Sequence, residues 1–174
     1  MQYQAAGIEV IGNDNVGDKA RQLIEKTPKV REIGFHTPRR TVLAQDAFDG
    51  YLQRMGYEGG LDAVVASTDL ETKIKNGSLS RQELELLKRV YNIYGKVPMA
   101  VRSSAAGDSR GTGTYRTEFT NGGVLNLGRA LKHVWSSYFS PDAIAFRGSV
   151  INLMDFMIFI LLSKFVDKTR FRGL

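Results

Sequence analysis

The chain has 174 residues, enough for one domain with a substantial core, because single domains commonly run to about 100–200 residues. Hydrophobic residues make up 43% of it, which excludes wholesale disorder, and the absence of cysteine excludes disulfides, thiolate catalysis and cysteine-ligated metals. The formal net charge of +6 indicates a surface that attracts anions, but it does not choose among nucleic acid, acidic membrane and nucleotide phosphates.

The first half of the chain predicts two strand–helix pairs. A strand at Gly7 to Ile11 leads through a polar loop into a helix from about Asp18 to Glu25, which Pro28 is expected to limit. A buried strand at Thr41 to Ala44 feeds into a second helix, which ends before Gly56. That helix has apolar residues at i, i+3, i+4 and i+7, which are Phe48, Tyr51, Leu52 and Met55.

Further along, the charged segment from Asp69 to Ser78 is expected to be a surface insertion. Ser80 and Glu83 then form the pattern of a capping box, which predicts the start of a helix. Gly95 is expected to stand just beyond its end.

The remaining elements mix strand and helix. Pro98 to Ser103 predicts a short buried strand, and the segment from Ala105 to Gly113 is a loop rich in Gly, Ser and Thr. The helical period returns from Leu127 to Tyr138, with Trp135 on the apolar face and therefore in the core. We expect an α+β fold in a single domain over residues 1–174.

The longest apolar stretch, Val150 to Val166, is interrupted by polar residues. Its clean part, Phe156 to Leu162, is much shorter than the roughly 20 apolar residues that span a bilayer. We expect a buried strand or core helix there and no membrane partner. Since no basic-then-apolar signal opens the chain, a cytoplasmic location is expected.

The strand that ends at Ser103 places Arg102 and two hydroxyl groups directly before the glycine-bearing loop. Such a loop brings backbone N–H groups close to phosphate oxygens, and arginine supplies a planar fork that suits them. The pattern lacks the fixed glycine–lysine spacing of a P-loop. Phosphate handling is therefore a hypothesis that this segment by itself does not establish.

Four separated elements follow one another in order along the chain, namely Val16-Gly17-Asp18-Lys19-Ala20-Arg21-Gln22-Leu23, Met99-Ala100-Val101-Arg102-Ser103-Ser104 with Thr117-Glu118-Phe119 and Asn121 after its loop, Val134-Trp135-Ser136-Ser137-Tyr138-Phe139, and Asp142-Ala143-Ile144-Ala145-Phe146-Arg147. Together they resemble the N-terminal ATP-binding domain of the pyruvate phosphate dikinase and phosphoenolpyruvate synthase family over roughly Val16 to Arg147. Asp18 and Ala20 replace glycines that the family usually has on either side of the lysine. The loop between Ser104 and Glu118 is shorter than in the synthases.

The resemblance implies a partial ATP-grasp-like fold, namely the N-terminal nucleotide-binding lobe with a mixed sheet and packed helices. It implies that Lys19 and Arg102 contact the phosphates of ATP, while the segment from Gly111 to Tyr115 forms part of a lid. By residue chemistry alone, Lys19 also fits a solvated helix position and Arg147 also fits a partner for a nearby carboxylate. The nucleotide-binding candidates are Lys19, Arg102, Ser103, Gly111, Thr112, Gly113, Thr114, Glu118 and Arg147.

The family's phosphoryl transfer uses Mg²⁺ held on carboxylates from the second half of the ATP-grasp fold, and those ligands are not identifiable here. We therefore expect the ATP-binding portion of a phosphoenolpyruvate synthase or pyruvate phosphate dikinase-like phosphotransferase, incomplete for catalysis alone. The alternative is a catalytically inactive relative that acts as a binding or regulatory module.

Three further expectations concern partners and histidines. The stretch from Val150 to Val166 is expected to mediate a homo-oligomer or to contact a partner chain, because large exposed apolar patches tend to associate. Neither His36 nor His133 lies in a phosphohistidine motif, so no catalytic histidine is predicted. With only these two histidines and no cysteine, no histidine-rich metal site is predicted either. Nucleic acid is not an expected partner, since basic and aromatic residues do not interleave.

Overall fold

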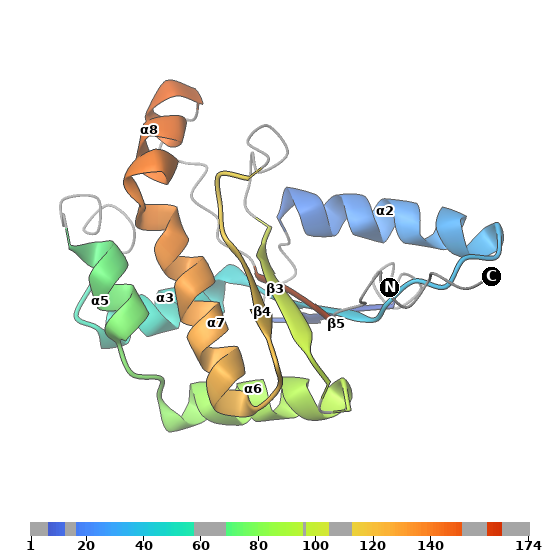
Figure 1. The fold of residues 1–174 in the computed structure, drawn as a ribbon, viewed down its shortest axis with the longest axis horizontal. Coiled ribbons are helices and arrows are strands. Elements are labelled where there is room, and N and C mark those ends of the chain that lie inside the picture. The colour runs from blue at the N-terminus through green and yellow to red at the C-terminus, as the bar shows by residue number, and fades with distance from the viewer. Residues whose placement is uncertain are drawn as a thin grey trace.

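The computed structural model describes residues 7–12, 17–57, 69–95, 97–104, 113–150 and 160–164, with 147–150 and 160–164 described by their backbone alone. Five strands form one sheet in the order β1-β2-β5-β3-β4 (Figure 1). β1 and β2 are parallel, and the other neighbouring pairs are antiparallel. The strands are β1 (Ile8–Ile11), β2 (Arg40–Leu43), β3 (Met99–Ser103), β4 (Thr117–Thr120) and β5 (Ile160–Lys164).

The helices cover both faces of this sheet (Figure 1). Helix α2 packs on one face, where Ala20 and Ile24 meet Val42 of β2. The opposite face carries the larger core, in which Trp135 of α7 lies 5.2 Å from the ring centroid of Phe48 in α3. The helices are α2 (Asp18–Glu32), α3 (Gln45–Arg54), α5 (Leu70–Asn76), α6 (Arg81–Ile93), α7 (Val124–Ser136), the 3₁₀ turn η1 (Ser137–Phe139) and α8 (Pro141–Val150).

The predicted helix ends are confirmed for α3 and α6. Gly56 follows α3 with φ of +89°, a conformation that glycine adopts without the steric cost of a Cβ. At the start of α6, the hydroxyl of Ser80 accepts from the N–H of Glu83 and the Glu83 carboxylate accepts from the N–H of Ser80. The predicted strands at the first two β positions and the core placement of Trp135 are confirmed as well.

The expectation that Pro28 limits the first helix is wrong, because α2 continues through Pro28 to Glu32. An interior proline removes one helical hydrogen bond and costs about 3 kcal/mol, so tertiary contacts must offset it. Thr27, next to the proline, is buried and its hydroxyl accepts a 3.2 Å hydrogen bond from Arg40 of β2. These contacts hold the second half of α2 against the sheet.

The segment expected to be a surface insertion is instead a core helix, α5. Leu70 and Ile74 are buried, and the carbonyl of Ile74 accepts a 2.7 Å hydrogen bond from the buried Tyr51 hydroxyl. Two apolar residues in a charged stretch of seven residues are too weak a pattern to distinguish a core helix from a loop. Packing against α7 decides the outcome.

Strand β5 comes from the apolar stretch between Val150 and Val166, and the prediction of a strand is confirmed for residues 160–164. β5 pairs on one edge with β2 and on the other with β3. The backbone of these five residues is therefore already paired within the chain. Residues 151–159 and 165–166 lie outside the described residues.

The elements together form the predicted α+β fold with a mixed sheet. In the parts of the chain that the structure describes, every helix is too short or too polar to cross a lipid bilayer.

Candidate functional site

The start of α2 and the end of β3 meet, although 84 residues of sequence separate the contacting pairs. The fully buried hydroxyl of Ser104 accepts a 2.9 Å hydrogen bond from the N–H of Ala20. Beside it, Lys19 Nζ lies 3.5 Å from Ser103 Oγ. The structure thus brings together the lysine segment and the arginine–serine segment that the sequence singled out separately.

The local sequence explains why this helix end depends on a distant serine. Gly17 occupies the N-cap position of α2 and has no side-chain oxygen to bond the first turn. Ser104 supplies that oxygen from the segment after β3. The positive end of the α2 dipole consequently points toward the end of β3, an arrangement that favours anions.

Arg102 lies on the same side of the sheet as α2. Arg102 is the register partner of Leu161 in β5, and Leu161 is the register partner of Val42 in β2. Val42 packs against α2. Residues level with each other on neighbouring strands share a face, so Arg102 projects toward the α2 side. Its side chain is exposed and therefore accessible to a ligand.

Two more arginines extend the positive charge on this side. Arg40, at the start of β2, is on the α2 side and donates to Thr27. Burial lowers the pKa of Arg40, and the neighbouring guanidinium groups of Arg31 and Arg102 lower it further. Like charges held this close favour a polyanion, which would relieve their repulsion.

Glu118 lies on the opposite side of the sheet from Arg102. It is level with Val101, whose side chain packs in the core beneath α7. Its carboxylate is 3.4 Å from His133 Nδ1 and 3.5 Å from Arg116 Nη1. Glu118 and Arg102 therefore do not share a face of the sheet.

The predicted lid segment is described only at its end, because Gly111 and Thr112 lie outside the described residues. Gly113 is exposed with φ of +94°, and Thr114 is half-buried. Directly after them, the ring of Tyr115 stacks on Tyr138 with centroids 4.3 Å apart. The chain is therefore anchored to η1 where the loop ends.

Arg147 falls in α8, near its C-terminal end, and its side chain is not described. His133 lies on α7, half-buried beside Glu118, and His36 is exposed in the segment before β2. Within the described ranges, no group of three His, Asp or Glu side chains is arranged to hold a metal ion. We therefore assign no residue to Mg²⁺.

Sequence reasoning passed over two residues of this site. Ser104 lies in the segment that resembles the family but was not predicted as a site residue. Its signal in the sequence is Gly17, an N-cap without a side-chain oxygen, so that the first turn of α2 needs an oxygen from elsewhere. Arg40 was part of a basic pair with no distinguishing pattern. Only the pairing of β2 with β5 and of β5 with β3 places it on the side of Arg102.

Comparison with known families gives one match along most of the chain. The family model described as the pyruvate phosphate dikinase AMP/ATP-binding domain matches residues 13–158. The matched region contains both sides of the contact between Lys19 and Ser103. None of the curated proteins compared with the chain matches it.

Proposed function

The chain belongs to the family of pyruvate phosphate dikinase AMP/ATP-binding domains, and we propose that the start of α2 and the end of β3 hold the phosphates of ATP. The family is described as binding AMP or ATP. Our proposal concerns which residues of this chain bind the phosphates.

The observation that carries this proposal is the contact of Lys19 and Ala20 with Ser103 and Ser104. It brings an ammonium group and the positive end of a helix dipole to the strand end that carries Arg102. Phosphate oxygens are strong acceptors, and charge-assisted hydrogen bonds from lysine and arginine bind them more tightly than neutral donors do. Arg40 and Arg31 add to the potential that attracts the triphosphate.

The segment from Gly111 to Tyr115 is the proposed lid over these phosphates. The stacking of Tyr115 on Tyr138 supports this role, because it fixes the end from which the loop would close. The exposed Gly113 stands next to that anchor with a positive φ, where a side chain would be strained. Glu118 and Arg147 remain predictions, and the position of Glu118 on the α7 side favours a structural ion pair for it.

In the wider reaction, we propose that the chain is the nucleotide-handling part of an ATP-dependent phosphotransferase related to phosphoenolpyruvate synthase. Phosphoryl transfer requires neutralisation of the phosphates, and the cations of the α2 side supply part of it. Mg²⁺ would supply the rest, but the described side chains do not fit its site, so no step is derived through it.

Titration calorimetry with ATP tests the phosphate site. We expect Arg102→Ala and Lys19→Ala each to weaken binding by about 1.5–3 kcal/mol, the range for hydrogen bonds to charged groups. The matched control is Lys88→Ala, since Lys88 is an exposed cation of α6 paired with Glu85. Unchanged affinity in both site variants, or an equal loss in the control, would remove the α2 and β3 ends from the nucleotide site.

A γ-phosphate release assay on the purified chain then separates an enzyme from a binding module. Turnover that Arg102→Ala abolishes would support the phosphotransferase. ATP binding without release or exchange, at any Mg²⁺ concentration, would support the inactive binding or regulatory module.

A further inference from the structure

A solvent-open surface cavity of about 490 Å³ lies between α7 and the connection from α5 to α6, residues 77–80. It lies in the helical layer on the α7 side of the sheet, whereas Arg102 faces α2 and Lys19 belongs to the first turn of α2. The sheet and α7 therefore separate this cavity from the proposed phosphate site. Nothing in the proposed function uses it.

The lining of the cavity is strongly basic. Lys75 of α5 and Arg129 and Lys132 of α7 contribute three basic side chains, and His133 stands beside them. None of the described residues that line the cavity carries a carboxylate. Glu118, the acid that faces His133 from β4, is already paired with that histidine and with Arg116. The cavity thus has an excess of positive charge that an anion would neutralise.

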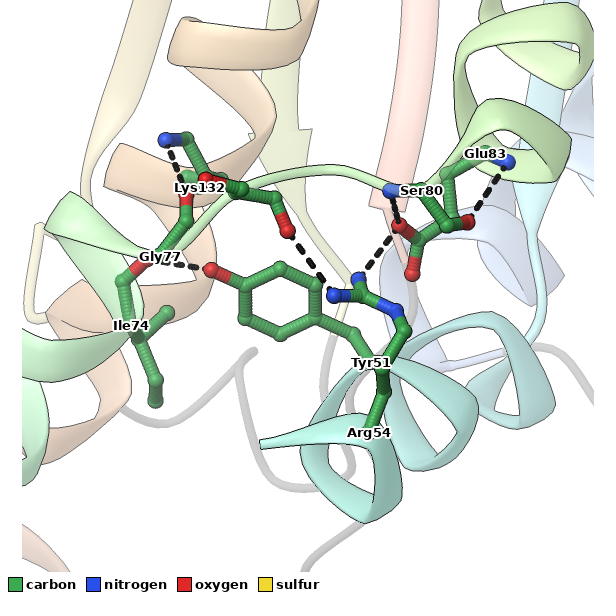
Figure 2. Close-up of polar contacts among 8 residues, drawn as sticks. Tyr51, Arg54, Ile74, Gly77, Ser80, Glu83 and Lys132 are labelled. Atoms are coloured by element: carbon green, nitrogen blue, oxygen red, sulfur yellow. Dashed lines mark hydrogen bonds and ion pairs between the residues drawn. The ribbon is translucent and has the colours of Figure 1, made fainter. Parts of the chain in front are cut away.

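Hydrogen bonds hold the 77–80 wall in place, as Figure 2 shows. Lys132 donates to the carbonyl of Gly77, and Arg54 donates to the carbonyl of Ser78 at 2.9 Å. At the far end of the wall, Arg54 also pairs with Glu83, which closes the capping box with Ser80 (Figure 2). The cavity is consequently formed without a ligand and needs little ordering to accept one.

Apolar side chains complete the cavity. Leu79 and Leu84 line it, and Leu79 packs so close to Gly128 of α7 that a Cβ there would overlap it. Leu125, which is 78% exposed, stands at its edge. A ligand that joined an anionic group to an apolar ring or chain would satisfy both parts of the lining.

We propose that this cavity is a second ligand site, which binds a small phosphorylated molecule that carries an apolar group. The phosphate dianion lies among Lys75, Arg129 and Lys132, and the apolar group lies against Leu79 and Leu125. A phosphate suits a lining with three basic side chains better than a single carboxylate does, because it carries up to two charges and three acceptor oxygens. Burial lowers the pKa of Lys132, and a bound anion would stabilise its charged form.

The test uses the full chain and phenyl phosphate, followed by amide chemical shifts in NMR and by titration calorimetry. We expect saturable binding, with shifts centred on Leu79 and Gly128. Inorganic phosphate should bind more weakly and phenol should not bind. The double variant Lys75→Gln, Arg129→Gln should weaken binding by at least about tenfold, since it removes two charge-assisted contacts. Both side chains are exposed, so the fold should survive, and the thermal midpoint checks this.

The matched control is Arg81→Gln, Lys88→Gln, which removes two exposed cations from α6 without touching the cavity. It should bind phenyl phosphate like the unmodified chain, and so should Lys19→Ala, Arg102→Ala, which makes this result independent of the ATP site. The proposal is overturned if the cavity variant binds as tightly as the control, if phenol binds equally well, or if the shifts centre on α2. Binding of an RNA oligonucleotide or a polyglutamate peptide without binding of phenyl phosphate would also overturn it, in favour of a macromolecular partner.

Discussion

Ser104 shows how one buried hydroxyl joins two distant segments. It has no exposed surface, and the N–H of Ala20 depends on it. Substitution by alanine would leave that buried donor without a partner, which costs about 1–3 kcal/mol. We therefore expect Ser104→Ala to lower the free energy of unfolding in urea by that amount.

Ser78→Ala is the matched control for this variant, because Ser78 is exposed and contributes only its backbone carbonyl to the contact with Arg54. Its free energy of unfolding should stay within about 0.5 kcal/mol of the unmodified chain. An equally small loss in Ser104→Ala would show that water or another group satisfies Ala20.

Two buried tyrosines make stability depend on alkaline pH. Burial raises the pKa of Tyr51 and of Tyr94 to about 12, from the ordinary value near 10. The folded chain therefore holds these phenolic protons more tightly than the unfolded chain. Their contribution to the free energy of unfolding is therefore fully present below about pH 10 and is lost as the pH rises through about 12.

Ultraviolet absorbance of tyrosinate during an alkaline titration measures this effect. The phenols of Tyr51 and Tyr94 should ionise late, and Tyr94→Phe and Tyr51→Phe should each remove one late step. If all tyrosines of the folded chain ionise together near pH 10, the buried positions of these rings are wrong.

Two glycines, one within α3 and one after α5, differ in the space around them, so replacing each with alanine tests the packing of these helices. Gly50 lies exposed within α3, with no atom near the place of a Cβ, so Gly50→Ala should stabilise the chain by about 0.5–1 kcal/mol. Gly77 follows α5, where a Cβ would overlap the hydroxyl of Tyr51. Because that hydroxyl is buried and bonded to Ile74, Gly77→Ala should destabilise the chain by about 1–3 kcal/mol.

The thermal midpoints of the two variants should therefore move in opposite directions. A rise for both would mean that the end of α5 is loosely packed against α3. It would also weaken the case for a preformed wall at the basic cavity.

At the scale of the whole molecule, β5 joins two halves of the sheet. Without it, β1 and β2 would form one ribbon and β3 and β4 another. A proline within a central strand removes a ladder hydrogen bond and leaves an acceptor unpaired. We expect Leu162→Pro to lower the free energy of unfolding by about 2 kcal/mol or more, whereas Leu162→Val keeps the N–H and serves as the control.

Chemical denaturation followed by circular dichroism measures this loss. Amide hydrogen exchange gives an independent reading, since the amides of Val42 and Val101 should lose protection together in the proline variant. Unaltered protection of both would show that the two ribbons do not depend on β5.

Local sequence patterns were sufficient to predict helices α3, α6 and α7. The capping box at Ser80 and the apolar period of α3 and α7 predicted those helices, because the caps and the i, i+4 neighbours lie within one or two turns. Lys19 and Arg102 were likewise selected from the sequence, through a family resemblance that the family match confirms. Their roles in binding stay predictions.

The tertiary structure alone decided which of these residues meet. The Ser104 hydroxyl accepts from Ala20, 84 residues away in the sequence. Glu118 turns toward His133 instead of Arg102, because β3 and β4 pair in one register and alternate residues face opposite sides. Local patterns also misjudged Pro28 and the segment of α5, since contacts with distant elements stabilise both. Composition and period determine which segments can be helix or strand. The faces that two strands share, and hence the site, depend on long-range pairing that no local pattern contains.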